Sequence, residues 1–452
     1  MKFADLGVND QICTALANAG IVEAFQIQEL TIPLALEGKD VIGQAKTGTG
    51  KTLGFGIPLL MKITPPADEK YQSLGIAMGK PQALVIAPTR ELGLQVADDL
   101  ERASGTMGLR ILRVYGGKSY EPQIEALQSG VDIVVGTPGR ILDLAKQRHL
   151  DLGFVRVLVL DEADEMLDMG FLPDVEKMVS LLPVSRQTML FSATMPGQII
   201  NLARRYMSNP THIRAVNPDD KESSTVDAIE QHVWRAHILD KNELVAKVLQ
   251  ATTCTKAIIF CKTKRAAQRV SDDLTERGFS TVAVHGDLSQ VAREKSLEQF
   301  KADKAKILVA TDVAARGIDI DAVSHVINFE CPEDEKAYVH RIGRTGRAGA
   351  SGVAVTLVDW ADLTRWSNIN TALGLAFADP LETYSSSEHV YVGLGIPAGT
   401  KGRLNAMPPV STPPKSLPPK KSSQKSSNSN SSSSRPKAER NRQRTNKFRD
   451  GQ

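Results

Sequence analysis

The sequence predicts an α/β protein made of two doubly wound parallel-sheet domains. Short apolar runs rich in β-branched residues alternate with stretches of helical periodicity, and the same alternation restarts after a polar segment near the middle of the chain. The runs are apolar throughout, as expected for parallel strands that helices cover on both faces. Strands and helices that alternate in this way typically form doubly wound sheets.

Each expected strand occupies a short segment. In the first domain, residues 1–216, these segments are 39–44, 82–88, 110–115, 131–136, 155–160 and 186–194. A polar linker without periodicity, residues 217–227, leads to the second domain, residues 228–375. There the expected strands are 256–261, 280–286, 305–311, 322–329 and 352–358. An extension, residues 376–400, precedes a tail rich in Pro, Ser, Lys and Arg, residues 401–452, which is expected to be disordered because it cannot bury a core.

Composition and charge restrict the class of protein. The chain has 452 residues, 41% of them hydrophobic, which suits two or three domains with sizeable cores. It shows no apolar run of membrane-spanning length and no export signal at its start, so we expect a cytoplasmic protein. The four cysteines lack metal-ligand spacing and are expected to be separate reduced thiols, without a structural metal. The tail holds 13 Lys or Arg and 2 Asp or Glu, a net charge of +11, whereas the first 400 residues hold 42 and 50, a net charge of −8.

The segment AKTGTGKT, residues 45–52, follows the first expected strand and precedes a helical stretch. It fits the phosphate-binding loop pattern GxxxxGK[ST], except that Ala45 occupies the first glycine position. Gly48 and Gly50 let the backbone curl around a phosphate and present N–H groups to it. Lys51 supplies positive charge for the β and γ phosphates, and the Thr52 hydroxyl can ligate Mg²⁺. The segment therefore predicts a site for a nucleoside triphosphate and Mg²⁺, with a chance glycine-rich turn as the alternative.

Four carboxylates directly follow the strand expected at 155–160; they are Asp161, Glu162, Asp164 and Glu165. A solvated turn that begins an acidic helix is one interpretation, because acids at a helix start complement its dipole. A phosphate-binding loop also needs an acid at the end of a neighbouring strand. Asp161 is therefore the expected Mg²⁺ ligand, partly through water, and Glu162 the expected base for the hydrolytic water. Glu165 keeps the interpretation of a helix-start acid.

Eleven motifs occur in the order of a known family. They are FQIQ (25–28), AKTGTGKT (45–52), APTREL (87–92), GG (116–117), TPGR (137–140), DEAD (161–164), SAT (192–194), IIFCKT (258–263), QVAR (290–293), ATDVAARGID (310–319) and HRIGRTGR (340–347). Through them the chain resembles the DEAD-box ATP-dependent RNA helicases of superfamily two, of the bacterial type with a basic tail, over residues 3–375. The resemblance implies that both domains are RecA-like.

The resemblance assigns the ATP site residue by residue. Gln28 would pair with adenine through its amide, and Phe3 would stack on adenine, with an ordinary core position as the alternative for Phe3. The other ATP contacts would be Asp319 at the ribose and the loop residues Ala45, Lys46, Thr47, Gly48, Thr49, Gly50, Lys51 and Thr52. The sequence departs from the family pattern where Ile21 replaces an aromatic and where Ala24 and Phe25 replace Pro-Thr. These departures put adenine selectivity in doubt more than phosphate binding.

The second domain would complete the catalytic site. Three arginines within eight residues need anionic partners if they are buried. The resemblance assigns Arg344 and Arg347 as arginine fingers, which stabilise charge on the transferring phosphoryl group; a solvated basic turn is the alternative. The implied catalytic residues are Glu162, Lys51, Asp161, Arg344 and Arg347. The implied coupling residues, which would link ATP to the second domain, are Asp164, Ser192, Thr194 and His340.

Nine residues at strand ends are implied to bind RNA. They are Thr89, Arg90, Gly116, Gly117, Thr137, Gly139, Arg140, Arg293 and Thr311. Gly permits close approach of a backbone. Thr, Arg and backbone N–H groups suit phosphate and sugar contacts, which carry little base preference. Taken singly, each of these residues is better explained as a turn or cap residue.

Together these assignments predict an ATP-dependent RNA helicase in which RNA-stimulated ATP hydrolysis accompanies closure of the two domains and local opening of structured or duplex RNA. A DNA helicase or translocase, and an ATP-dependent RNA clamp that unwinds little, are the alternatives. The tail would bind phosphates nonspecifically or serve as a solubilising end. We expect a monomer that does not bind membranes, and ribosomal or RNA-decay proteins are left open as partners.

Overall fold

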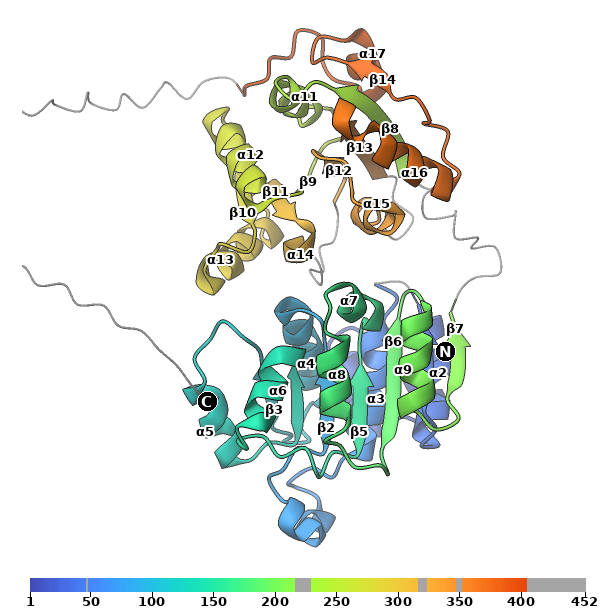
Figure 1. Cartoon of the computed structure of the whole chain (residues 1–452). Helices are drawn as coiled ribbons and strands as arrows, with labels where there is room; N and C mark the ends of the chain where they lie inside the picture. Colours follow the sequence, from blue (N-terminus) through green and yellow to red (C-terminus); the bar gives the residue numbers. More distant parts are fainter. Residues whose placement is uncertain (46–47, 216–228, 316–322, 347–351, 405–452) are drawn as a thin grey trace, which may run out of the picture. The chain divides into compact units, whose positions relative to one another are not determined.

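The computed structural model describes residues 1–45, 48–215, 229–315, 323–346 and 352–404 (Figure 1). The expected linker, residues 217–227, lies outside the described residues, as does most of the expected tail. Four expected site residues also lie outside them: Lys46, Thr47, Asp319 and Arg347. No helix in the part of the chain that is described is both long and apolar enough to cross a bilayer.

The first domain is a seven-stranded parallel sheet covered by helices on both faces (Figure 1). Its strands, in sheet order, are β3 (Ile111–Val114), β4 (Ile133–Gly136), β2 (Ala83–Ile86), β5 (Val157–Leu160), β6 (Gln187–Ser192), β1 (Val41–Gln44) and β7 (Thr211–Arg214). Alternate side chains of each strand enter two separate hydrophobic clusters. One cluster packs against α1 (Asp10–Asn18), α2 (Gln26–Leu36), α3 (Lys51–Lys62) and α4 (Arg90–Ser104). The other packs against α5 (Glu121–Ser129), α6 (Pro138–Lys146), α7 (Ala163–Asp168), α8 (Leu172–Val179) and α9 (Gly197–Tyr206).

The second domain repeats this plan with a second seven-stranded parallel sheet. Its strands, in sheet order, are β10 (Thr281–Val284), β11 (Ile307–Thr311), β9 (Ala257–Cys261), β12 (His325–Asn328), β13 (Gly352–Val358), β8 (Ile229–Ala236) and β14 (Leu381–Thr383). On one face lie α11 (Lys241–Val248), α12 (Lys264–Glu276) and α17 (Glu388–Leu394). On the other face lie α13 (Gln290–Lys301), α14 (Asp312–Ala315), α15 (Glu335–Ile342) and α16 (Leu363–Leu373).

The two sheets share one strand order. Numbered within its own domain, each sheet runs third, fourth, second, fifth, sixth, first and seventh strand. This arrangement confirms the predicted fold class of two doubly wound parallel-sheet domains. It also means that any strand of the first domain has a counterpart of known position in the second.

Three strands were not expected from the sequence. β7 and β14 are edge strands that keep exposed side chains, and β8 mixes buried apolar with polar residues, so none is apolar throughout. β14 and α17 fall in the segment 376–400 and pack on the second sheet. Residues 401–404, which the sequence places in the tail, also contact this domain: Gly402 N donates to Glu243 Oε1 at 3.0 Å, and Leu404 N donates to Arg277 O at 3.0 Å.

Candidate functional site

In the first domain, the motifs that follow strands lie at the carboxyl ends of those strands and divide the sheet edge into two sides. Three adjacent strands, β5, β6 and β1, lead into the DEAD segment, the SAT segment and the phosphate-binding loop. The expected RNA residues follow the other three adjacent strands, β2, β4 and β3. In the second sheet, Thr311 ends β11 and Arg293 follows β10, the strands that correspond to β4 and β3. Ligands of doubly wound sheets bind outside the carboxyl ends of the strands, so the first domain presents two adjoining binding edges.

The end of the phosphate-binding loop has a conformation that requires glycine. Gly50 caps α3 at φ 80° and ψ 24°, in the left-handed region. A Cβ atom there would lie 2.5 Å from Gln28 Nε2 and 2.7 Å from Phe25 Cδ2. Gln28 Nε2 donates to Gly50 O at 2.8 Å, and Gln28 Oε1 accepts from Phe25 N at 2.9 Å. Gln28 therefore joins the start of α2 to the loop, and its amide keeps one N–H and one lone pair for a ligand.

A pocket in the first domain joins this loop to apolar and acidic side chains. Its lining in this domain comprises Ile21, Phe25, Gln28, Gly48, Gly50, Lys51, Thr52, Leu53, Leu92, Gln95, Asp99, Asp161 and Glu162. Apolar side chains suit the flat face of a base, and the N-terminus of α3 with its lysine suits phosphate. The composition of the pocket therefore fits a nucleotide.

The aromatic side chain in this pocket is Phe25, which differs from the expectation for Phe3. Phe25 is 60% exposed at the start of α2, whereas Phe3 is 3% exposed within the core cluster of α1 to α4. A buried ring cannot stack on a ligand, so Phe3 fits the alternative of an ordinary core residue. The sequence did signal Phe25, because it stands as an aromatic just before α2 where the family pattern differs.

Lys51 has no hydrogen-bond partner for its ammonium group. It is the first residue of α3, its side chain is buried, and its Nζ makes no hydrogen bond to any described residue. It forms an ion pair with Glu162 Oε1 at 3.9 Å. A buried cation with unused donors is costly, and phosphate oxygens would satisfy all of them. The arrangement points to an anionic ligand beside Lys51.

The two acids at the end of β5 are buried and crowded. Burial raises the pKa of Asp161 to about 7; the nearby charge of Lys51 lowers it and that of Glu162 raises it further. Asp161 Oδ1 also accepts from Glu162 N at 3.0 Å. Glu162 has φ 49° and ψ 55°, a left-handed conformation that is uncommon for a residue other than glycine and is often found at functional sites.

Asp161 could hold Mg²⁺ only if a bound ligand and water supplied further oxygen atoms. Burial raises the pKa of Asp161 in spite of the nearby charge of Lys51, and a hard divalent cation would add positive charge beside this carboxylate. The described residues contain no group of three or more His, Cys, Asp or Glu that could hold a metal by itself. Phosphate and water oxygens would have to complete the coordination, as is usual for Mg²⁺.

A hydrogen-bond network connects the DEAD and SAT segments. Asp164 Oδ2 accepts from both Thr194 N and Thr194 Oγ1, each at 2.8 Å. Ser192 Oγ accepts from Asp164 N at 3.2 Å and donates to Thr194 O at 2.7 Å. Ala45 N, at the start of the phosphate-binding loop, donates to Ser192 O at 3.1 Å. Glu165 lies in the first turn of α7 as expected, although its side chain is buried instead of solvated.

The expected RNA residues of the first domain have structural contacts as well. Thr89 caps α4, because its Oγ1 accepts from Leu92 N at 3.3 Å. Gly117 has φ 82°, and a Cβ atom there would lie 2.3 Å from Arg90 Nη1, so the Arg90 side chain packs on the Gly117 backbone. Gly116 lies in the turn after β3, Thr137 follows β4 as the N-cap of α6, and Gly139 lies in the first turn of that helix.

Arg140 differs from the expectation of an RNA contact. Its side chain is largely buried, Nη2 donates to Lys118 O at 2.8 Å, and the guanidinium lies 3.8 Å from the centre of the Tyr120 ring. Among the described residues its Nη1 has no hydrogen-bond partner. Arg140 therefore supports the loop after β3.

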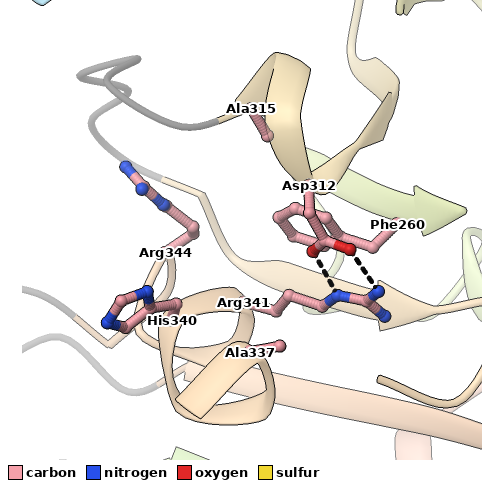
Figure 2. Close-up of a pocket in the computed structure, with 7 residues that line it drawn as sticks. All are labelled: Phe260, Asp312, Ala315, Ala337, His340, Arg341 and Arg344. Atoms are coloured by element: carbon pink, nitrogen blue, oxygen red, sulfur yellow. Dashed lines mark hydrogen bonds and ion pairs between the residues drawn. The ribbon is translucent and has the colours of Figure 1, made fainter. Parts of the chain in front are cut away.

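In the second domain, Arg341 forms the contact that sequence reasoning missed. Arg341 is 1% exposed, and its Nε and Nη2 donate to Asp312 Oδ1 and Oδ2 at 2.6 and 2.7 Å (Figure 2). Its Nη1 donates to Glu330 O at 3.0 Å and Asn328 Oδ1 at 3.2 Å. Arg341 thereby joins α15 to the ends of β11 and β12. The signal was the acid in ATDVAARG, whose partner lies 29 residues along the chain.

Two expected site residues project from the same helix end. Figure 2 shows His340 and Arg344 on the side opposite to the contact between Arg341 and Asp312. The small pocket that these residues line has a volume of about 20 Å³, room for about one water molecule, so it is no ligand site by itself. Arg293 Nη2 donates to Ala314 O at 2.9 Å, which ties α13 to α14.

Comparison with known proteins shows the family. The DEAD/DEAH box helicase model matches residues 25–202, and the helicase conserved C-terminal domain model matches residues 240–349. The chain is 45% identical over 356 residues to the DEAD-box ATP-dependent RNA helicase CshA of Geobacillus kaustophilus, covering 79% of this chain and 73% of that protein. The chain belongs to the DEAD-box family of ATP-dependent RNA helicases.

Further relatives support the assignment of this chain to the DEAD-box family. It is 47% identical over 357 residues to CshA of Listeria monocytogenes, covering 79% of this chain and 66% of that protein, so it spans about two thirds of that relative's length. S. cerevisiae Dbp5 bound to RNA and ADP BeF3 superposes with a TM-score of 0.72 at 28% identity, covering 85% and 96% of the two chains. Mss116p bound to ssRNA and AMP-PNP gives a TM-score of 0.71 at 26% identity, covering 87% and 82%.

The counterpart of Lys51 in the second domain already has partners within this DEAD-box chain. β8 occupies the place of β1, and the helix after it, α11, begins with Lys241 as α3 begins with Lys51. Lys241 is fully buried; its Nζ donates to Phe329 O at 2.9 Å and Leu357 O at 3.2 Å, and lies 3.0 Å from Asp359 Oδ2. This lysine needs no phosphate, which distinguishes the two domains.

Proposed function

We propose that this DEAD-box chain couples ATP hydrolysis in its first domain to local remodelling of RNA, and that ATP and RNA both favour a state in which the domains close. The observation that supports this most is the position of the motifs on the two sheets. The first domain presents the phosphate-binding loop and the DEAD and SAT segments on one side of its sheet edge and expected RNA residues on the other, and the expected RNA residues of the second domain belong to the strands that correspond to the second of these sides. Closure would therefore complete an ATP site and an RNA surface in one movement.

In the ATP site, Lys51 would hold the β and γ phosphates and Glu162 would accept a proton from the attacking water. Asp161 and Thr52 would hold Mg²⁺, which neutralises phosphate charge when bound. Arg344 and Arg347 would act as arginine fingers from the second domain. The Lys51 ammonium, which makes no hydrogen bond to the described residues, and the raised pKa of Asp161 support these roles, because both groups gain from the charges of Mg²⁺ and ATP.

Adenine would bind between Phe25 and the amide of Gln28. Phe25 offers an exposed ring, and Gln28 keeps one donor and one acceptor after binding Gly50 O and Phe25 N. An amide can present both groups to adenine, which a carboxylate cannot do.

Loss of the γ phosphate would be transmitted through Asp164. This carboxylate lies two residues after the proposed base and binds Thr194, in a network that also reaches the phosphate-binding loop through Ser192 and Ala45. His340 would extend the network into the second domain. When hydrolysis releases the phosphate contacts, the closed state loses its advantage and RNA is released.

RNA would be held mainly through its backbone, so we propose a weak sequence preference. The RNA-bound forms of Dbp5 and Mss116p support RNA as the ligand class. Arg90, with its side chain packed on Gly117, is the proposed phosphate contact with the best-defined position. A cytoplasmic location, a monomeric state and the identity of protein partners stay predictions.

ATP turnover with and without RNA tests this proposal. Steady-state ATPase activity is measured without nucleic acid, with a single-stranded RNA and with DNA of the same sequence, and displacement of a short RNA duplex is followed in parallel. We expect RNA to raise kcat several-fold and DNA to have little effect. Equal stimulation by DNA would favour the translocase alternative, and stimulation without strand displacement would favour the clamp. The same ATPase activity with and without RNA would contradict the proposal.

A further inference from the structure

Glu330 occupies the position in the second domain that Glu162, the proposed base, occupies in the first. Glu162 is the second residue after β5, and Glu330 is the second residue after β12, the corresponding strand. The neighbouring strands are in the same register, since the last residue of β5 pairs with Ile86 of β2 and the last residue of β12 pairs with Phe260 of β9. The residues around the two glutamates can therefore be compared one by one.

A single backbone position gives the two glutamates different partners. Lys262, two residues after the paired residue of β9, donates from its N to Glu330 Oε2 at 2.6 Å. Its counterpart after β2 is Pro88, which has no N–H to donate. The next residue in each domain is a threonine that caps the following helix, which supports this match. Glu162 cannot make the corresponding bond and forms an ion pair with Lys51 instead.

The main chain of Glu330 also supports the helix that leads to the proposed arginine finger. Arg341 Nη1 donates to Glu330 O at 3.0 Å, while its Nε and Nη2 donate to Asp312 (Figure 2). Arg344, the proposed finger, donates from its N to Arg341 O at 3.2 Å. The buried guanidinium of Arg341 is therefore held between two anchors, Asp312 and Glu330, directly beneath the turn that carries the finger.

The carboxylate anchor of Arg341 adjoins the expected RNA residues of the second domain. Asp312 directly follows Thr311 and begins α14. Arg293 Nη2 donates to Ala314 O, in the same short helix, at 2.9 Å. Both expected RNA residues of this domain therefore adjoin or contact α14, which holds one side of the Arg341 guanidinium.

We propose that Glu330 is a positioning residue through which bound RNA sets the place of the arginine finger; this inference rests on the function proposed above. The bond from Lys262 N fixes the end of β12, so Glu330 O gives Arg341 a fixed acceptor. RNA that binds at α14 shifts the other anchor of the guanidinium. A rigid, planar group held at one fixed point passes that shift on to Arg344. The acid that serves as the proposed base in the first domain thus serves as a brace in the second.

ATP hydrolysis by the full chain with saturating RNA tests this role. Glu330→Ala removes the acceptor for Lys262 N, whereas Glu330→Gln keeps an acceptor of the same reach. We expect Glu330→Ala to lower the RNA-stimulated kcat by about tenfold, as for the loss of one hydrogen bond to a charged group, while the KM for ATP stays within about twofold of wild type. Glu330→Gln and the control Glu333→Ala, at an exposed acid three residues on, should keep a wild-type kcat. A wild-type kcat in Glu330→Ala, or an equal loss in Glu330→Gln, would overturn the proposal.

A second variant removes the same bond from the donor side. Lys262→Pro copies the first domain and deletes the N–H while leaving Glu330 unchanged. It should reproduce the loss seen in Glu330→Ala, and the double variant should lose nothing more, because both changes remove one interaction. Losses that add up in the double variant would overturn the proposal.

The arginine finger provides a readout that a purely structural role would not affect. In an Arg344→Ala background, Glu330→Ala should leave the RNA-stimulated kcat unchanged, because Glu330 acts through Arg344; a further fall would overturn the proposal. The wild type separates this inference from the function on which it rests. A wild-type kcat that RNA does not raise would contradict the proposed function, whereas stimulation that Glu330→Ala shares in full would remove only the role of Glu330.

Discussion

Thr194 donates two hydrogen bonds, from its backbone N and its Oγ1, to a single oxygen of Asp164, each at 2.8 Å. The pair joins the end of β6 to α7, two residues after the proposed catalytic base Glu162. A carboxylate that accepts two short hydrogen bonds is strongly held, because hydrogen bonds to charged groups are worth about 1.5–3 kcal/mol each. In the proposed mechanism, a change of charge at the phosphates would reach the SAT segment through few intermediate bonds.

Replacing Thr194 by Val should uncouple ATP hydrolysis from RNA remodelling. The variant keeps the backbone bond to Asp164 but loses the Oγ1 bond, so we expect the KM for ATP to change by less than about threefold and strand displacement per ATP hydrolysed to fall about tenfold. The measurement combines ATPase and duplex-displacement assays. Thr188 is the matched control, since it lies on β6, which ends two residues before Thr194, and its buried Oγ1 has no hydrogen-bond partner among the described residues. Coupling in Thr194→Val equal to that in Thr188→Val would remove this network from the mechanism.

Asp161 should make the ligand-free protein less stable as pH rises. Its folded-state pKa is about 7, whereas an unfolded Asp titrates near 3.9, so between these values the unfolded chain releases a proton that the folded chain retains. Stability falls as pH rises through this window, and the penalty is complete above about pH 7. The Tm of wild type should therefore decrease relative to Asp161→Asn between pH 5 and 7 and then stay level. Parallel Tm curves for the two proteins would contradict the burial of an uncompensated carboxylate.

Replacing Gln28 by Glu should weaken ATP binding even though the two side chains have nearly the same shape. A carboxylate oxygen would face Gly50 O, where Gln28 Nε2 now donates at 2.8 Å. An unsatisfied buried acceptor costs about 1–3 kcal/mol, so we expect ATP affinity to fall at least about fivefold by calorimetry. Gln26→Glu, on an exposed residue in the first turn of the same helix, should bind ATP normally because an acid there suits the helix dipole. Normal ATP affinity in Gln28→Glu would exclude Gln28 from the site.

Arg341 should matter for the stability of the second domain more than its position in a basic motif suggests. Its removal leaves Asp312, a partly exposed carboxylate, without its cation; breaking a fully buried ion pair costs about 3–5 kcal/mol, which is the upper limit here. Arg341→Ala should therefore shift denaturant unfolding of this domain strongly. The control is Arg365→Ala, because Arg365 pairs with Asp362 at a more exposed site where a pair is worth at most about 1 kcal/mol. Equal effects of the two substitutions would show that the Asp312 contact contributes little.

Most of the strands that the sequence predicts have residues buried on both faces, and their short apolar runs identify them. β3 and β10 are edge strands with partly buried residues, and they were predicted because they too are mainly apolar. β8 eluded prediction because its eight residues include Glu230, Gln231 and His232 among apolar ones. β14 has only three residues at a sheet edge. Edge strands need few apolar residues, and their position is decided by the neighbour they pair with, which is not encoded locally.

The functional site also combines residues that can be recognised locally in the sequence with contacts that depend on the fold. Lys51, Asp161 and Glu162 follow strands directly, so their convergence at one sheet edge was predictable from position along the chain. The spacing of Phe3 gave no information about burial, and the structure places that ring in the core. The role of Arg341 depends on Asp312, a residue on a different strand end. Contacts between distant segments need the fold before they can be assigned.

We propose that ATP and RNA favour the same closed state, so the RNA affinity of Glu162→Gln should depend on whether ATP is bound. This variant should bind ATP but hydrolyse it very slowly, so binding can be measured at equilibrium. We predict that saturating ATP tightens RNA binding by about 5-fold to 150-fold, that RNA tightens ATP binding by the same factor, and that adding Arg344→Ala abolishes both effects. An RNA affinity that is identical with and without ATP would contradict the account.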